Sequence, residues 1–450
     1  MKDLQTNTIY MLGIGGIGMS ALARYFRQQG KEVSGYDRTS TPLTQQLEAE
    51  GMNIHYSDDP AYIPCDAGIV IYTPAVPESN RELNYCRDME FNIKKRAEVL
   101  GMIAKSHDTI AIAGTHGKTS ISSMIAHIMH ESERPVTAFI GGIMNNYDTN
   151  MLRTYKSKYL IAEADEYDRS FLNLHPKIAV ISTLAADHLD IYGSLENMKA
   201  SFSKFIGQTD TDGRVIIHES VAGQVITPAN TIIYGMGQDA TLRIQNVRVY
   251  EHHFYFDLVS EDGLVTIRME VPGMHNIENA TAAAGVCLQI GLSLEEIKLG
   301  LETYKGVKRR FEFILEGETI FIDDYAHHPD EIAACVDTAK KLYPDRKITG
   351  IFQPHLYSRT RDFADGFASA LETLDEIILL DIYPAREEPI EGVDSQMLLA
   401  KIRNNNKSIS SRSELPEMIK KKRPGVLLSM GAGDIDQLVG PIKEKLTEQE

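Results

Sequence analysis

Short apolar runs of strand length recur along the chain, separated by segments with helical spacing and by glycine-rich or polar turns. In the first hundred residues, residues 8–12 and 67–72 form such runs, and residues 31–37 form a run that ends in an acid. Residues 19–29 have the spacing of a helix. This alternation predicts a small α/β domain over residues 8–98.

A second series of elements begins near residue 97, and a third begins near residue 307. Residues 231–272 change to a period of two around a turn at 261–263, so we expect an antiparallel patch appended to the second part. The third part alternates strands and helices, which favours a mostly parallel sheet with helices on both faces. The expected strands are 109–113, 159–162, 177–182, 319–323, 347–353, 376–381 and 426–430, and the expected helices are 120–130, 276–289, 329–342 and 363–374.

Composition narrows the class of protein. A chain of 450 residues suggests about three domains, and 43% hydrophobic with 24% charged residues is ordinary for a globular protein. The net charge is −17, and no dense basic run occurs before residues 420–423, which argues against a duplex nucleic-acid partner. A local basic pocket for an anionic small substrate is compatible with that charge.

The cysteines and the N-terminus indicate the compartment. The four cysteines are far apart and form no C-x-x-C pair, which favours thiols in a reducing environment. Glycines interrupt the apolar run after residue 9, so it is a poor signal peptide. No apolar stretch is long enough to span a bilayer. We therefore expect a cytoplasmic protein with no membrane partner.

The first candidate for chemistry is a phosphate-binding loop. The expected strand 109–113 leads into Gly114-Thr115-His116-Gly117-Lys118-Thr119-Ser120, and a helix follows. Backbone N–H groups of such a loop surround phosphate oxygens, and the helix N-terminus adds its dipole. The lysine would reach the β- and γ-phosphates of ATP, and the threonine hydroxyl would bind Mg²⁺. Ile112 takes the place of the usual first glycine; the alternative is a glycine-rich turn with an incidental lysine, which the flanking strand and helix make a poor explanation.

Acidic residues follow the next expected strand. Glu163-Ala164-Asp165-Glu166 supplies three carboxylates directly after residues 159–162, and hard oxygen ligands suit a magnesium–nucleotide site. Asp187-His188, after the strand at 177–182, would add a second metal-binding group. A solvated acidic loop and a structural histidine are the alternatives.

The N-terminal loop Gly13-x-Gly15-x-x-Gly18 has dinucleotide-binding spacing, with Asp37 at the end of the next strand. Alone it predicts NAD binding. Physically it offers a helix N-terminus to a pyrophosphate and an acid to a ribose, and a UDP-linked ligand has the same groups.

Polar clusters also follow three strands of the third part, at 323–328, 353–361 and 383–388. Ligands of open α/β sheets bind beyond these strand ends. The arginines there would suit a carboxylate or a phosphate through bidentate pairing, although each residue alone could be an ordinary surface group.

Together these motifs resemble the Mur ligases, and the resemblance covers nearly the whole chain. The form of the first loop favours the branch of that family that adds L-alanine. The residues that carry the resemblance are 13–23, 114–119, 163–166, 187–188, His275-Asn276-x-x-Asn279, Arg309-Arg310-Phe311, 323–329, 353–355 and 431–434.

The resemblance implies three α/β domains. These are a Rossmann-like domain for a UDP sugar (1–98), a central P-loop ATPase-like domain with the antiparallel patch (99–306), and a Rossmann-like C-terminal domain that closes over ATP and helps to hold the amino acid (307–450). It also implies an ATP- and Mg²⁺-dependent ligase that joins L-alanine to the lactyl carboxylate of UDP-N-acetylmuramate through an acyl phosphate. A monomer or weak homodimer is expected.

The resemblance assigns roles by motif. Asn276 and Asn279 would reach adenine, Arg310 the phosphates and Asp323 the ribose. Many relatives carry a basic residue where Leu356 stands, so the alanine carboxylate is expected to depend more on Arg359. A carbamylated lysine, as in sister ligases, would have to be Lys199 or Lys204 and is left open. The residues implied for ATP are Gly114, Thr115, His116, Gly117, Lys118, Thr119, Ser120, Asn276, Asn279, Arg310 and Asp323; for the UDP sugar and alanine, Gly13, Gly15, Gly16, Ile17, Gly18, Asp37, Thr73, Tyr325, His327, His355, Arg359 and Arg386; for metal, Thr119, Glu163 and His188; and for catalysis, Lys118, His188, His327, His355 and Arg359.

Three other functions remain open from the sequence. An NAD(P)-dependent oxidoreductase would explain the first loop and Asp37, but it leaves the second phosphate loop unexplained. A non-catalytic ATP-gated binding module predicts nucleotide binding without ADP release. Another ligase of the family would add a preformed peptide to the same sugar, or glutamate to folate.

Overall fold

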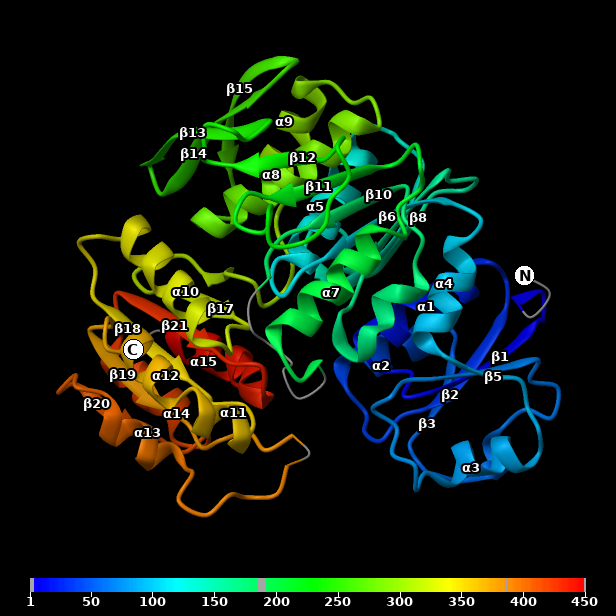
Figure 1. The fold of residues 1–450 in the computed structure, drawn as a ribbon. Helices are drawn as coiled ribbons and strands as arrows, with labels where there is room; N and C mark the ends of the chain where they lie inside the picture. Colours follow the sequence, from blue (N-terminus) through cyan, green and yellow to red (C-terminus); the bar gives the residue numbers. More distant parts are fainter. Residues whose placement is uncertain (1–3, 185–191, 386, 449–450) are drawn as a thin grey trace. The chain divides into compact units, whose positions relative to one another are not determined.

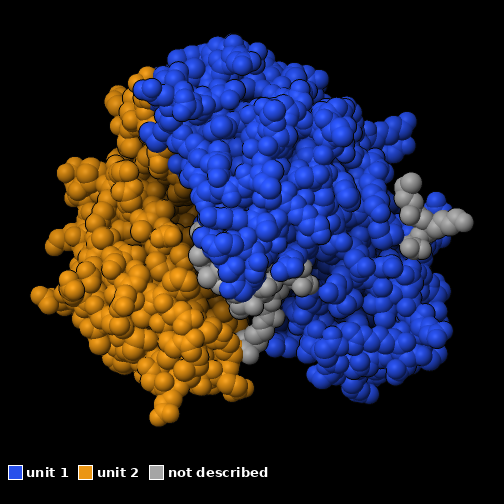
Figure 2. Space-filling model, in the orientation of Figure 1, with its two compact units in different colours: residues 1–245, 257–267, 278–304 blue, residues 246–256, 268–277, 305–450 orange. Residues whose placement is uncertain are grey.

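The structure is a computed structural model that describes residues 4–184, 192–385 and 387–448. It contains sheets of five, ten and six strands (Figure 1), and these confirm the predicted three-part α/β fold class. Contacts between residues group the chain into two compact units, which Figure 2 colours separately. Unit 1 comprises residues 1–245, 257–267 and 278–304, and unit 2 comprises residues 246–256, 268–277 and 305–450.

The first sheet is parallel throughout, in the order β3-β2-β1-β4-β5. In β1, Ile9 and Met11 pack into one core, while Tyr10 and Leu12 pack into another on the opposite face. Strands covered on both faces are continuous apolar runs, which is why the pattern located β1 and β4. The elements are β1 (Thr8–Leu12), α1 (Ile17–Gln28), β2 (Glu32–Tyr36), α2 (Pro42–Ala49), β3 (Asn53–His55), η2 (Pro60–Tyr62), β4 (Ile69–Tyr72), α3 (Arg81–Asp88), β5 (Ile93–Lys95) and α4 (Arg96–Ala104).

Buried polar contacts fix α1 to the second sheet. Asn150, on β8, is fully buried, and its Nδ2 donates to the carbonyl oxygen of Ile17 at 2.7 Å and to the hydroxyl of Ser20 at 2.9 Å. Its Oδ1 accepts from Arg24, whose guanidinium also pairs with Glu50 at 2.8 Å. Leaving any of these buried groups unpaired would cost its desolvation energy, so the network holds α1 in one place within unit 1.

A buried carboxyl group on α3 also packs against the first sheet. Glu82 is fully buried; it accepts hydrogen bonds from the hydroxyl of Tyr10 and from the backbone N–H of Asp59. The Tyr10 oxygen lies 2.7 Å from Nε2 of His55. Burial raises the pKa of Glu82 to about 7, helped by the charges of Asp58 and Asp59 and opposed by the two hydrogen bonds.

We expect this group to make stability depend on pH. A glutamate titrates near pH 4.3 when unfolded, so the folded chain binds the proton more tightly. The stabilisation is fully present below about pH 4 and is lost as the pH rises through the folded pKa. Between pH 5 and pH 8, the wild type should therefore lose about 2 kcal/mol of its free energy of unfolding through this group. Glu82→Gln should not show this loss. Urea denaturation at both pH values measures this, with the exposed Glu48→Gln as control; parallel pH profiles for Glu82→Gln and wild type would contradict it.

The second sheet has the order β15-β14-β13-β12-β11-β10-β6-β9-β7-β8. β6 lies between β10 and β9 and is parallel to both. The elements are β6 (Asp108–Ala113), α5 (Lys118–Glu131), β7 (Val136–Met144), β8 (Thr149–Arg153), β9 (Tyr159–Glu163), η3 (Tyr167–Asn173), β10 (Ile178–Ile181), α7 (Leu195–Ile206), β11 (Arg214–His218), β12 (Ile232–Gly235), β13 (Leu242–Tyr250), β14 (His253–Ser260), β15 (Gly263–Met269), α8 (Met274–Gln289) and α9 (Leu294–Thr303).

The predicted antiparallel patch corresponds to β13, β14 and β15. Glu251 and His252 connect β13 to β14 with φ angles of 47° and 58°, the backbone of a two-residue hairpin turn, which joins antiparallel strands. The predicted turn at 261–263 joins β14 to β15, whose first residue is Gly263. β12 differs from the prediction, because it pairs in parallel with both β11 and β13; the patch therefore begins one strand later.

The third sheet lies in unit 2, in the order β16-β17-β21-β18-β19-β20. Only the β16–β17 pair is antiparallel among the pairs of this sheet, which confirms a mostly parallel sheet. The helix expected at 363–374 corresponds to α12, and the short helix α11 precedes it. The elements are β16 (Glu312–Leu315), β17 (Ile320–Asp324), α10 (Pro329–Leu342), β18 (Ile348–Phe352), α11 (Tyr357–Asp362), α12 (Ala364–Leu371), β19 (Glu376–Leu379), α13 (Ser395–Lys401), β20 (Lys407–Ile409), α14 (Leu415–Lys422), β21 (Val426–Met430), η4 (Asp434–Leu438) and α15 (Val439–Thr447). In the part of the chain that the structure describes, no helix is long and apolar enough to cross a bilayer.

Candidate functional site

The predicted phosphate loop lies at the carboxyl end of β6, flanked by the ends of β9 and β10. Gly114 and Gly117 have φ angles of 139° and 85°, which residues other than glycine rarely adopt. A Cβ atom on Gly114 would lie 2.1 Å from the hydroxyl of Ser182. Glycine is therefore required there both by the backbone angle and by the space.

Residues after β10 hold this loop. Thr115 N–H donates to the carbonyl oxygen of Thr183 at 3.1 Å, and His116 N–H donates to the Thr183 hydroxyl at 2.9 Å. The hydroxyl of Ser182 donates to the carbonyl oxygen of His116 at 2.5 Å. No sequence motif marked Ser182 or Thr183; their position just after a parallel strand was the only signal.

The ammonium group of Lys118 lies between the loop and a buried carboxylate. It donates to the carbonyl oxygen of Gly114 at 2.6 Å and to the two oxygens of Glu166 at 2.8 and 3.0 Å. Burial disfavours the charged amine, but Glu166, then Asp165 and Glu163, outweigh that effect and raise the pKa of Lys118. Lys118 is therefore charged at neutral pH.

Glu163, the last residue of β9, faces the first turn of α5. Its carboxylate accepts hydrogen bonds from the hydroxyls of Thr119 and Ser122, each at 3.2 Å, and from the N–H of Gly141 at 2.6 Å. A Cβ atom on Gly141 would lie 2.5 Å from this carboxylate. A hydroxyl and a carboxylate at this spacing are oxygen donors of the kind Mg²⁺ prefers, so Thr119 and Glu163 fit the predicted metal role.

The three carboxylates of the acidic motif have three different partners. Glu163 faces Thr119, Glu166 pairs with Lys118, and Asp165 lies 3.6 Å from the guanidinium of Arg96. The sequence of the motif could not predict these three partners. Beyond the end of β9, the direction of each side chain depends on the conformation of the loop and not on the alternation of a strand.

The residues predicted for adenine lie on the first turns of α8. Asn276 and Asn279 are both buried, and Nδ2 of Asn276 donates to the carbonyl oxygen of Pro272 at 2.7 Å. A Cβ atom on Gly117 would lie 2.5 Å from Oδ1 of Asn279. The structure therefore brings Asn279 against the phosphate loop.

The N-terminal glycine loop is stabilised by Asp37. One carboxylate oxygen accepts from the N–H of Gly15 at 2.8 Å and the other accepts from the N–H of Arg38 at 2.7 Å. A Cβ atom on Gly13 would lie 2.6 Å from Cγ2 of Thr73. Asp37 and Thr73 thus contact the loop directly; their contact with a substrate stays a prediction.

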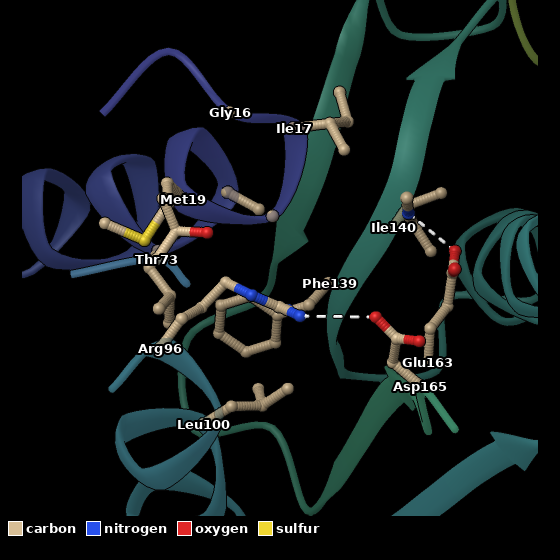
Figure 3. A pocket seen from close by; sticks show the side chains of 14 residues that line it. Gly16, Ile17, Met19, Thr73, Arg96, Leu100, Phe139, Ile140, Glu163 and Asp165 are labelled. Carbon is tan, nitrogen blue, oxygen red and sulfur yellow. Dashed lines mark hydrogen bonds and ion pairs between the residues drawn. The ribbon is translucent and has the colours of Figure 1, made fainter. Parts of the chain in front are cut away.

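A cavity of about 310 Å³ lies beside the start of α1 (Figure 3). Gly16, Ile17, Gly18 and Thr73, all predicted for the UDP sugar, line one part of it, and Glu163 and Asp165 line another. Within unit 1, the cavity therefore connects the predicted sugar loop to the predicted metal ligand.

In unit 2, Arg309 contacts Asp323, the residue predicted for the ribose. Its guanidinium donates to Asp323 at 3.1 Å and to the carbonyl oxygen of Gly431 at 2.5 Å, and it lies 5.2 Å from the centre of the Tyr325 ring. Burial raises the pKa of Asp323, against the opposing effect of Arg309. The other oxygen of Asp323 is buried without a hydrogen-bond partner among the described residues, so it is available to a ligand hydroxyl.

The segment that carries Arg310 is held in an unusual conformation. Arg309 and Phe311 have φ angles of 64° and 48°, and Asp324 accepts hydrogen bonds from the N–H groups of Phe311 and Ala326, each at 2.7 Å. Burial raises the pKa of Asp324 to about 7. Such strain persists only where neighbours impose it, so Asp324 fixes the segment from which Arg310 extends.

Two predicted histidines lie together at the ends of β17 and β18. The rings of His327 and His355 are 6.3 Å apart, and His355 stacks on Tyr383 at 5.7 Å. Nδ1 of His327 lies 3.0 Å from the carbonyl oxygen of Tyr325, whose ring is 5.2 Å away. Arg359 is half-buried and lies on α11. Leu356, the residue just before this helix, has a φ of 70°.

Two predicted residues, His188 and Arg386, lie outside the described residues, as does Asp187. Within the described ranges, no three His, Cys, Asp or Glu side chains gather in a metal-binding group. The residues that the sequence did not single out are Arg96, Ser122, Gly141, Ser182 and Thr183; Asp324 was part of the polar cluster at 323–328 but had no role assigned to it.

Comparison with protein families gives three matches. A model described as "Mur ligase family, catalytic domain" matches residues 8–108, "Mur ligase middle domain" matches residues 112–287, and "Mur ligase, glutamate ligase domain" matches residues 309–433. Together they cover most of the chain.

Curated proteins and solved structures agree with these matches. The UDP-N-acetylmuramate–L-alanine ligase of Cytophaga hutchinsonii is 46% identical over an aligned length of 454 residues, and the alignment covers 98% of this chain and 97% of that protein. A UDP-N-acetylmuramate–alanine ligase structure from Thermotoga maritima has a TM-score of 0.85 at 28% identity, covering 98% of this chain and 99% of that one. A murein peptide ligase from Psychrobacter arcticus has a TM-score of 0.73, also with 98% and 99% coverage, but at 22% identity it shows the shared fold alone.

Proposed function

The chain belongs to the Mur ligase family, and we propose that it is the ATP-dependent ligase that joins L-alanine to the lactyl carboxylate of UDP-N-acetylmuramate, releasing ADP and phosphate. The observation that carries the chemistry is the charged Lys118 in a glycine loop, beside the Thr119–Glu163 pair. The reaction supplies a peptidoglycan precursor and hence serves cell wall biogenesis, cell shape and cell division.

The reaction has two steps. The lactyl carboxylate attacks the γ-phosphorus of ATP, which forms an acyl phosphate and releases ADP. The amine of L-alanine then attacks the acyl carbon, and the tetrahedral intermediate expels phosphate. Negative charge develops on the transferred phosphoryl group in the first step, and the Lys118 ammonium with the loop N–H groups stabilises it.

Thr119 and Glu163 are the described residues that would hold Mg²⁺, with His188 assigned by motif. When bound, the ion would neutralise phosphate charge. Neither residue needs to move a proton in this role.

The attacking amine must lose a proton, and His327 or His355 is assigned as the acceptor. An imidazole has a pKa suited to accepting a proton near pH 7. Arg359 and Tyr325 are assigned to the alanine, and Asn276, Asn279, Arg310 and Asp323 to the nucleotide.

The proposal places the reaction in the cytoplasm, where ATP is supplied and where reducing conditions keep the four free cysteines as thiols. A monomer or a weak homodimer is proposed for the active form, and sedimentation velocity at assay concentration tests it.

We expect phosphate release from ATP to require UDP-N-acetylmuramate and L-alanine together, with the alanyl product identified by mass spectrometry. A panel with glycine, L-serine and a preformed peptide beginning with L-alanine gives the specificity. Turnover with the peptide but not with free L-alanine would identify a recycling ligase instead, and no turnover with any of them would overturn the proposal.

A further inference from the structure

Arg96 occupies a position that helix stability does not explain. It is the first residue of α4, where the positive end of the helix dipole disfavours a cation. Its side chain is 24% exposed and lines the cavity beside the apolar side chains of Leu100 and Phe139. Placing a guanidinium in such surroundings carries a desolvation cost, so its retention there points to a partner that enters the cavity.

The guanidinium lies against the start of α1. A Cβ atom on Gly18 would come within 2.9 Å of Nη1 of Arg96 and 3.2 Å of its Cζ. The third glycine of the N-terminal loop therefore makes room for this guanidinium. Figure 3 shows Arg96 extending into the cavity toward Asp165, which lies two residues beyond the end of β9.

The ion pair between Arg96 and Asp165 is weak. The Nη2–Asp165 distance is 3.6 Å, which is beyond hydrogen-bond range, and the Asp165 side chain is 42% exposed. An ion pair of this kind contributes little. An entering anion can therefore compete for the guanidinium.

On the basis of the proposed function, we propose that Arg96 binds an anionic group of UDP-N-acetylmuramate, its diphosphate or its lactyl carboxylate. Both groups present pairs of oxygens that match the guanidinium fork. The cavity extends from the loop assigned to the diphosphate, at Gly16 to Gly18, to Glu163, where the carboxylate must react. Arg96 lies between the two and acts as a substrate-positioning residue that no motif identified.

Calorimetric titration of the full-length chain with UDP-N-acetylmuramate and with UDP-N-acetylglucosamine tests this. The second ligand has the diphosphate but lacks the lactyl carboxylate. We expect Arg96→Gln to weaken UDP-N-acetylmuramate binding about 10- to 100-fold, the usual effect of losing a hydrogen bond to a charged group. Equal weakening of both ligands assigns Arg96 to the diphosphate, and weakening of UDP-N-acetylmuramate alone assigns it to the carboxylate.

Three further measurements make the result specific. Arg96→Lys should recover only part of the affinity, because an ammonium lacks the planar fork, and Gly18→Ala should weaken binding because the added methyl group displaces Nη1. Arg27→Gln, on the exposed side of α1, is the matched control. ATP affinity should stay within about threefold in all variants, since a lost surface contact is worth under 1 kcal/mol.

Two outcomes separate this inference from the function it rests on. If the wild type binds neither UDP sugar, the proposed function itself fails. If the wild type binds UDP-N-acetylmuramate and both Arg96→Gln and Gly18→Ala bind it as tightly, the role of Arg96 is wrong while the proposed function stands.

Discussion

Replacing Lys118 with alanine is expected to reduce kcat/KM for ATP by about 10³-fold or more, the range seen when a preorganised donor to transition-state charge is removed. The ammonium is held within 2.6 Å of the loop carbonyl of Gly114 and stays charged because Glu166 and its neighbours raise its pKa. Alanine supplies no charge to the transferred phosphoryl group. Coupled measurement of ADP release with saturating UDP-N-acetylmuramate and L-alanine gives the value.

This variant also removes the partner of a buried carboxylate, so activity and stability must be separated. Glu166 is 2% exposed, and breaking one side of a buried ion pair typically costs about 3–5 kcal/mol, whereas replacing both sides by neutral groups is often tolerated. The double variant Lys118→Met/Glu166→Gln should therefore unfold near the wild-type temperature and remain inactive. A stable double variant with near-normal turnover would mean that this loop does not hold the triphosphate.

The phosphate loop could be located from sequence because the strand before it and the helix after it are its direct neighbours in the chain. β6 ends in the buried apolar run Ile110 to Ala113, and the glycines, lysine and threonine follow it without a gap in the chain. The same holds for β1, β9, β10 and β21. Short, half-exposed strands such as β3 (Asn53–His55) and β5 (Ile93–Lys95) have too few apolar positions to be distinguished from loops.

The contacts that the sequence could not predict join distant segments. Arg96 and Asp165 are far apart in the chain, and so are Gly141 and Glu163; neither pair has a fixed spacing that chemistry requires. The Asn150 network with Arg24 likewise depends on how α1 packs on β7 and β8. Motifs therefore predicted the candidate reacting groups, whereas the residues that contact and orient those groups became visible only through packing.

Replacing Glu163 with glutamine is the second large effect that we expect, with kcat falling about 10²- to 10³-fold and the Mg²⁺ concentration for half-maximal rate rising at least about tenfold. The amide keeps the size of the side chain and can still accept from the N–H of Gly141, which now lies 2.6 Å from the carboxylate. The fold should therefore survive, while the negative charge that a divalent ion requires is lost. Initial rates across a Mg²⁺ titration at fixed ATP measure both quantities.

Ser122→Ala is the matched control for this variant. It removes one hydroxyl, at 3.2 Å, from the same carboxylate but leaves its charge, so the rate should fall less than about tenfold, as for one hydrogen bond, with little change in the Mg²⁺ requirement. Asp165→Asn distinguishes the neighbouring carboxylate, which faces Arg96 rather than Thr119. If Asp165→Asn raises the Mg²⁺ requirement and Glu163→Gln does not, the metal ligand has been assigned to the wrong carboxylate.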